Sequence, residues 1–108
     1  MRIRIVLLTC CLFLMSAAAS ADTAIATKWR PIALDQGDCM SYARMAIFRL
    51  GFCKSEPGSQ TMSGKLGDYT ASIRCLSNER LVFFIIAGPS PDTVANYLNV
   101  LYGQFGVR

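Results

Sequence analysis

The sequence contains no histidine, and only 17% of its 108 residues are charged. Without histidine the protein lacks both the usual general base of Cys-His and Ser-His catalysis and the commonest metal ligand. It also lacks a Cys-x-x-Cys pair, the motif of thioredoxin-like disulfide exchange. A chain of this length forms one small domain. We therefore expect no enzyme activity, no cofactor and no metal site.

The first 21 residues have the three parts of a secretory signal peptide. Arg2 and Arg4 supply the positively charged start. An apolar run from Ile5 to Met15 follows, and small residues end the segment at Ala21. The run is shorter than the roughly 20 residues that span a bilayer. We predict cleavage after Ala21 and a periplasmic or secreted protein without membrane contact; a retained membrane anchor is the alternative.

The chain after residue 21 carries little net charge. Without the two arginines of the signal segment, 11 basic and 7 acidic side chains become 9 and 7, a net charge of +2. Proteins that bind nucleic acid carry clustered basic side chains. Here only Lys28 and Arg30, which flank Trp29, form a short basic-aromatic stretch. We therefore expect a protein or a small ligand as the partner, and no nucleic acid.

Hydrophobic periodicity predicts two helices. The first begins near Asp35 or Asp38, both good N-caps, and ends at Leu50 before Gly51. The second begins after the N-cap Ser90 and has an uninterrupted apolar stripe. The expected inner positions are Cys39, Ala43, Ala46, Ile47 and Leu50 in the first helix, and Val94, Tyr97, Leu98, Leu101, Tyr102 and Phe105 in the second.

Three strands are expected between the two helices. Residues 59–63 form a weak strand, whereas residues 69–76 alternate apolar and polar side chains as a half-buried strand does. The run from Leu81 to Ala87 is apolar on both faces, so we expect both faces to be covered. The sequence thus predicts an α+β fold over residues 35–108, in which two helices lie on one face of a three-stranded antiparallel meander.

In a simple meander the strand from Leu81 to Ala87 would be an exposed edge, and such an edge pairs readily with other chains. We favour cover by an N-terminal arm, residues 22–34, in which residues 27–34 add a fourth strand. Cover within one chain needs only a short connection, and short connections are the rule. The alternative to a monomer of this kind is a homodimer that pairs through the strand from Leu81 to Ala87.

Three cysteines follow residue 21: Cys39, Cys53 and Cys75. In an oxidising compartment two of the three are expected to pair. Loop entropy gives about 3.8 kcal/mol for Cys39–Cys75 and about 3.4 kcal/mol for Cys53–Cys75, which does not decide between them. In the expected meander the first helix and the strand of Cys75 run the same way. Cys75 would then lie near the C-terminal end of the helix, close to Cys53 and about 16 Å along the helix axis from Cys39. This arrangement favours Cys53–Cys75 and leaves Cys39 as a free thiol, whereas a different strand order would favour Cys39–Cys75.

The free thiol is the only candidate nucleophile. At Cys39 it would lie in the first turn of a helix, whose dipole favours the reactive thiolate. A thiol-dependent redox or envelope-stress protein is therefore the alternative function.

The aromatic side chains Trp29, Phe84 and Tyr102 form a candidate interaction surface. The favoured function is that of a small exported, non-enzymatic binding module.

Three segments of the chain carry a resemblance to known proteins: Asp38-Cys39, Tyr69-Thr70-Ala71-Ser72-Ile73-Arg74-Cys75 and Val82-Phe83-Phe84-Ile85-Ile86-Ala87-Gly88-Pro89. The pattern around them resembles that of small exported bacterial proteins of unknown function, and the resemblance covers most of the chain after residue 21. It implies no activity and no residue roles.

Overall fold

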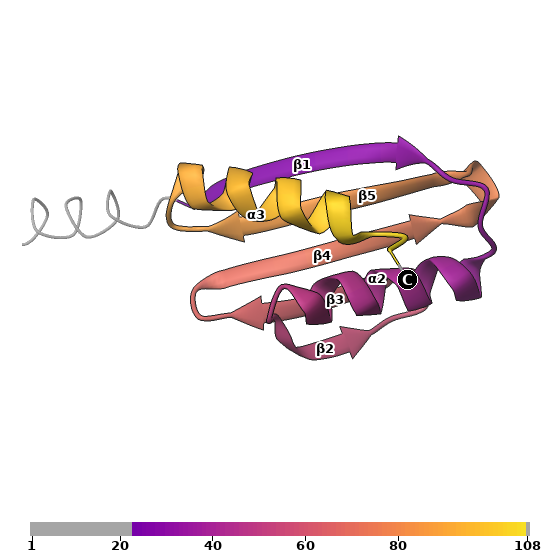
Figure 1. Ribbon diagram of the computed structural model, residues 1–108, viewed down its shortest axis with the longest axis horizontal. Helices are drawn as coiled ribbons and strands as arrows, with labels where there is room; N and C mark the ends of the chain where they lie inside the picture. Colours follow the sequence, from indigo (N-terminus) through magenta and orange to yellow (C-terminus); the bar gives the residue numbers. More distant parts are fainter. Residues whose placement is uncertain (1–22, 108) are drawn as a thin grey trace, which may run out of the picture.

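A computed structural model describes residues 23–107, and the expected signal peptide, residues 1–21, lies outside the described residues. The described chain folds into five strands, two helices and one short 3-10 helix, which confirms the α+β class (Figure 1). The elements are β1 Ala24–Pro31, α2 Gln36–Arg49, β2 Cys53–Pro57, β3 Thr61–Leu66, β4 Tyr69–Leu76, the 3-10 helix η1 Ser77–Glu79, β5 Leu81–Gly88 and α3 Pro91–Gln104.

The strands form one antiparallel sheet in the order β1-β5-β4-β3-β2. β1 pairs along the whole of β5, from Ala24 opposite Gly88 to Pro31 opposite Leu81. The N-terminal arm therefore covers β5 as a strand, which begins at Ala24 rather than at residue 27. Because β4 pairs with the other side of β5, β5 has no free edge through which the alternative homodimer could pair.

β2 is a strand that the sequence pattern does not predict. Residues 53–57 read Cys-Lys-Ser-Glu-Pro, without apolar alternation and with a proline, which sheets tolerate mainly at their edges. The strand pairs with β3 at the edge of the sheet, with a register shift between Cys53 and Glu56. The weak strand expected over residues 59–63 is β3, which begins at Thr61 and extends to Leu66. The meander thus has one strand more than expected at its start.

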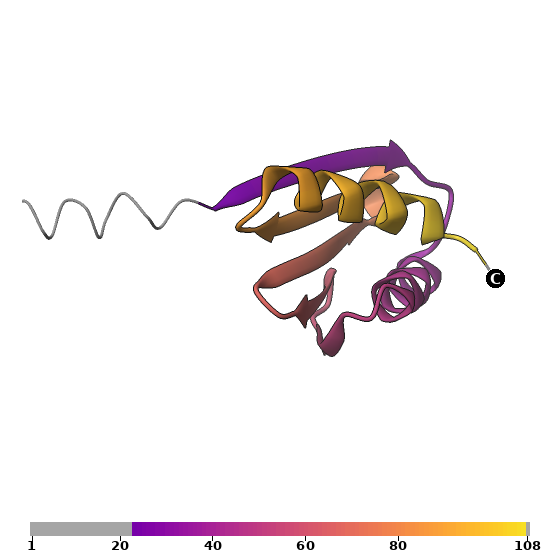
Figure 2. The same cartoon turned by 60° about the vertical axis from the view of Figure 1, so that its left-hand side comes forward.

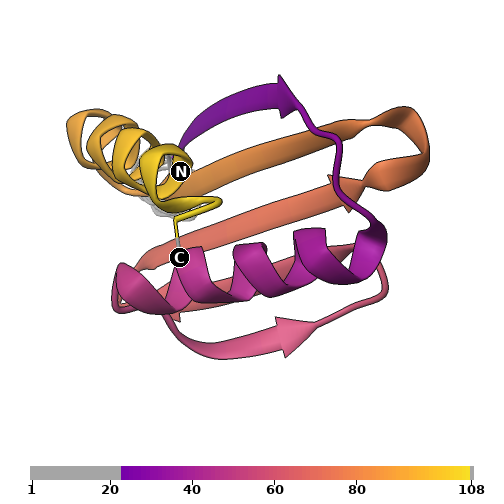
Figure 3. The same cartoon turned by 45° about the vertical axis from the view of Figure 1, so that its right-hand side comes forward.

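Both helices lie on one face of the sheet (Figures 1 and 3), as the sequence predicts. α3 packs on β5 and β1, and α2 packs on β3, β4 and β2. When the molecule is turned in Figure 2, both helices stay on the same side of the sheet. Val82, Phe84 and Ile86 of β5 point toward the helices and are fully buried. They join the buried residues of α2 and α3 in one core cluster.

The helix ends are where capping chemistry predicts them. Asp35 caps α2, and its Oδ1 accepts a hydrogen bond of 2.7 Å from the backbone N–H of Asp38. Gly51 has a φ of 85°, a left-handed conformation that glycine adopts easily, and it ends the helix. Ser90 caps α3, and its Oγ accepts a hydrogen bond of 3.4 Å from the N–H of Thr93. The carboxylate of Asp35 therefore has a structural role.

Candidate functional site

The disulfide joins Cys39 to Cys75, so the favoured Cys53–Cys75 pairing is wrong. The Cα atoms of the bonded pair are 6.0 Å apart, and both residues are fully buried. The physical reason for the error is β2. One extra strand between α2 and β4 reverses the direction of β4, which therefore ends beside the start of α2 (Figure 3). Cys75 near the end of β4 thus meets Cys39 near the start of α2.

Among the three cysteines of residues 23–107, Cys53 and not Cys39 is free. It is exposed at the start of β2, and its Sγ donates a hydrogen bond of 3.5 Å to the carbonyl oxygen of Gly51. Cys53 follows the C-terminal end of α2, so it does not lie at the helix N-terminus expected for the free thiol at Cys39. The activation expected for a thiol at Cys39 therefore acts on no free cysteine.

The three expected interaction residues do not share a surface. Phe84 is fully buried, with ring centroids of Tyr102 and Phe105 at 5.2 and 5.4 Å. Tyr102 is half-buried on α3, on the helix side of the sheet. Trp29 is 59% exposed and lies opposite Phe83 on the other side of the sheet. Phe84 is therefore a core residue, and Trp29 alone keeps most of its surface exposed.

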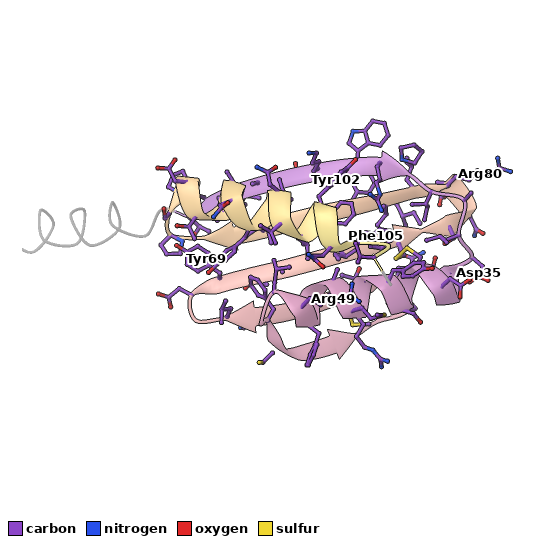
Figure 4. The ribbon with its side chains drawn as sticks, in the orientation of Figure 1. Asp35, Arg49, Tyr69, Arg80, Tyr102 and Phe105 are labelled. Carbon is purple, nitrogen blue, oxygen red and sulfur yellow. A yellow bond between two sulfur atoms is a disulfide. The ribbon has the colours of Figure 1, made fainter. Side chains whose placement is uncertain are left out.

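Lys28 and Arg30 place their charged groups over the rings of Tyr102 and Phe105, the two residues that Figure 4 labels near the C-terminal end of α3. The Lys28 Nζ lies 4.1 Å from the ring centroid of Tyr102. The Arg30 Cζ lies 4.9 Å from the ring centroid of Phe105, and its Nη2 donates a hydrogen bond of 3.0 Å to the Phe105 carbonyl oxygen. Such cation–π contacts stabilise a fold modestly. The basic-aromatic stretch therefore ties β1 to α3.

A polar hollow of about 270 Å³ lies between the start of α2, the turn before β3 and η1. In its wall the Gln36 side chain donates hydrogen bonds to the carbonyl oxygens of Ser59 and Cys75, at 3.1 and 3.0 Å, and accepts one of 3.3 Å from the Ser77 N–H. Small-molecule pockets are generally larger, at about 300–1,000 Å³. Within residues 23–107 no three His, Cys, Asp or Glu side chains gather to hold a metal ion. The hollow is therefore best explained by the hydrogen bonds through which Gln36 connects the start of α2 with the turn before β3 and with the end of β4 and start of η1.

The remaining candidate is the open face, the face of the sheet that no helix of the described chain covers. Alternate side chains of β5 point to it and are only half-buried, in contrast to the expectation that both faces of this strand are covered. On the neighbouring β1, Ile25 is 66% and Trp29 is 59% exposed. Cross-strand partners share a face. The apolar part of the open face is formed by Ile25, Trp29, Pro31, Leu81, Phe83, Ile85 and Ala87.

Polar side chains border this apolar part. Over β4 and β3 the open face carries Thr70, Ser72 and Arg74, and then Thr61, Ser63 and Lys65. Arg74 is held in place because its Nη2 donates a hydrogen bond of 3.0 Å to the Gln60 Oε1. The open face is therefore apolar over β1 and β5 and polar and basic over β4 and β3.

The open face includes residues that the sequence did not single out, namely Ile25, Phe83 and Ile85. The signal was present in the run from Leu81 to Ala87, whose two faces are both apolar. That run does not reveal which of its two sets of side chains meets the helices. Because β5 is apolar at its half-buried positions as well as at its buried ones, its sequence indicates that the open face has an apolar part.

No protein-family model matches the chain, and a search of curated proteins finds no match. Within residues 23–107, no helix has the length and apolar character needed to cross a membrane. The role of the chain is therefore inferred from its own residues.

Proposed function

We propose that the protein is an exported, non-enzymatic binding module that docks a protein partner on its open face. The observation that carries this proposal is the apolar part of the open face, where Ile25 and Trp29 leave 66% and 59% of their surface in water. Exposed apolar side chains that lie together, rather than singly, mark interaction sites on soluble proteins. Covering them with a partner recovers roughly 25 cal/mol for each Å² of apolar surface removed from water.

The arrangement of the open face suits a protein partner better than a small ligand. Stable interfaces have an apolar, often aromatic centre and a polar rim. Here Trp29 and Phe83 are directly opposite each other on β1 and β5, and Arg74 is opposite Phe83 on β4. Trp and Arg are the residue types most often responsible for binding energy. The complementary partner surface is flat and apolar, with a hydrogen-bond acceptor or a carboxylate opposite Arg74.

Two observations support export. The first is the signal-peptide pattern of residues 1–21, and the second is the Cys39–Cys75 disulfide, because disulfides persist in oxidising compartments. Non-enzymatic action is supported by the structural roles of the polar groups that come together. Asp35 caps a helix, and Gln36 joins three backbone segments.

Charging the open face is expected to abolish partner binding. Phe83→Glu places a carboxylate at the centre of the apolar part and leaves the buried side of β5 unchanged. Burying an unpaired carboxylate is strongly unfavourable, so at least tenfold less partner is expected in crosslinking pull-downs from the native envelope. The wild-type protein serves as the reference, and circular dichroism verifies that the variant is folded.

Asn78→Glu is the matched control, because Asn78 is exposed on η1 and lies outside the open face. This variant is expected to recover the same partner as the wild-type protein. Equal recovery by Phe83→Glu, or equal loss in both variants, would show that the open face is not the docking site.

The exposed thiol of Cys53 favours a second candidate, a thiol-dependent redox protein. A chromogenic disulfide reagent distinguishes the two functions. For a binding module we expect one thiol per native chain to react, at a rate within about threefold of the unfolded protein, because the chain has no histidine to act as a base. A native rate many times faster than the unfolded rate would support the redox function.

A further inference from the structure

The outer edge of β1 is unpaired. β1 is the terminal strand of the sheet, and no helix or strand formed by residues 23–107 lies beyond it in Figures 1, 2 and 3. The N–H of Ile32 donates a hydrogen bond of 3.0 Å to the carbonyl oxygen of Arg80, just past the end of β1. Because antiparallel strands alternate between hydrogen-bonded and free pairs, this bond fixes the pattern along the strand. The backbone groups of even-numbered residues face β5, and those of Ile25, Thr27 and Trp29 face outward.

The usual protection of a sheet edge is weak here. Edge strands commonly carry projecting lysines or prolines that block another strand. In β1 the proline is confined to the last position, Pro31. Lys28 and Arg30 have their charged groups over aromatic rings of α3, so these charges lie on the helix side of the sheet. The edge is therefore open to a further strand.

We propose that β1 pairs antiparallel with β1 of a second copy of this chain, about a two-fold axis at Thr27. The two five-stranded sheets then become one continuous sheet. In this register Thr27 lies opposite the second copy's Thr27, and Ile25 lies opposite the second copy's Trp29. The three outward-facing residues form hydrogen-bonded pairs, which supply about six backbone hydrogen bonds. The two exposed apolar side chains of β1 cover each other.

Repulsion between like charges disfavours the two registers in which the axis lies at Lys28 or at Trp29. With the axis at Thr27, Lys28 lies opposite Ala26 and Arg30 lies opposite the equally small Ala24. With the axis at Lys28 the two lysines are directly opposite, and with the axis at Trp29 each Lys28 faces an Arg30. Like charges directly opposite in an antiparallel pair destabilise it. An axis at Ala26 also separates the charges, but it places Trp29 opposite residue 23, which lies outside β1. Only the axis at Thr27 separates the charges and pairs Ile25, Thr27 and Trp29 with one another.

The helices leave room for this pairing. α3 lies over β1 and β5, and neighbouring strands are about 4.8 Å apart. The two copies of α3 are therefore expected about 10 Å apart across the axis, close to the 8–10 Å of packed helices. One strand pair is a small interface, so we expect a dissociation constant on the order of 10 μM. The dimer covers part of the Ile25 and Trp29 surface on which the proposed function rests, but it is argued from the backbone edge of β1 and leaves Phe83 and Ile85 of the open face free, so neither proposal requires the other.

A charge pair at the two-fold axis tests the dimer. The protein is expressed from its full sequence, purified as the cell processes it, and examined by sedimentation equilibrium from about 1 to 500 μM. The wild-type protein is expected to dimerise with rising concentration. Thr27→Lys and Thr27→Glu each place like charges opposite each other at the axis, so each alone is expected to dimerise at least tenfold more weakly. An equimolar mixture is expected to restore the dimer, because lysine then faces glutamate.

Asn78→Lys is the matched control and is expected to dimerise like the wild-type protein, since Asn78 lies on η1 rather than β1. Thr27 is exposed, so both variants should fold, and their urea unfolding curves verify this. A wild-type protein that stays monomeric up to about 500 μM would overturn the proposal. So would variants that dimerise unchanged, or a mixture that fails to recover the dimer. Partner recovery by Phe83→Glu and Asn78→Glu is unaffected by these outcomes, so the two proposals fail separately.

Discussion

Replacing Cys39 and Cys75 together with alanine is expected to lower the free energy of unfolding by about 3 to 4 kcal/mol, and the melting temperature by about 15 to 25 °C. The bond closes a loop between residues 36 apart in the sequence, which restricts the unfolded chain. It also holds the start of α2 to the end of β4 inside the core. A domain of this size has only about 5 to 15 kcal/mol of stability. Urea unfolding followed by circular dichroism measures the loss.

Cys53→Ser is the control for this double variant, because Cys53 is exposed and bonded to no other cysteine. Its unfolding free energy is expected to stay within about 0.5 kcal/mol of the wild-type value. A reducing agent should destabilise the wild-type protein and Cys53→Ser equally, and should leave the double alanine variant unchanged. A double variant as stable as the wild-type protein, or a large loss in Cys53→Ser, would contradict the Cys39–Cys75 pairing.

Phe84→Ala is expected to destabilise the protein by about 3 to 5 kcal/mol, the usual cost of removing a fully buried phenylalanine ring. Phe84 has no exposed surface and lies at the centre of β5. Its ring packs edge-on against the rings of Tyr102 and Phe105. Removing it leaves a cavity between the sheet and α3 that these neighbours fill only in part. Thermal and urea unfolding measure the effect.

The next residue in the same strand is the matched control. Phe83 points to the open face and is only half-buried, so Phe83→Ala is expected to cost no more than about 1 kcal/mol. The two variants remove the same ring from adjacent positions. Equal losses would contradict the assignment of one face of β5 to the core and the other to the surface.

Local patterns predict most of the fold because they depend on near neighbours. The stripe of α3, the cap at Ser90 and the alternation of β4 are visible in the sequence and present in the structure. β2 has no such pattern, because it is a short edge strand without an apolar face. Missing one strand reversed the expected direction of β4 relative to α2. The disulfide assignment failed for this reason, although the spacing of its cysteines was known.

The interaction surface was predicted less well than the fold. Whether Phe83 or Phe84 meets the helices depends on how β5 pairs with its neighbours, and a run that is apolar on both faces does not show this. Trp29 is exposed on the open face. Tyr102 and Phe84 belong with the packing of α3 on the sheet. A strand that is apolar on both faces was therefore the sequence feature that points to the open face, on which we propose that a partner docks.

Site-specific photo-crosslinking from position 83 tests the docking of a partner on the open face most directly. A photoreactive phenylalanine analogue replaces Phe83 in the full-length protein expressed in its native cells, and the same analogue replaces Asn78 in a parallel sample. The account predicts a discrete crosslinked product from position 83 and none from position 78. No product from position 83, or the same products from both positions, would contradict it.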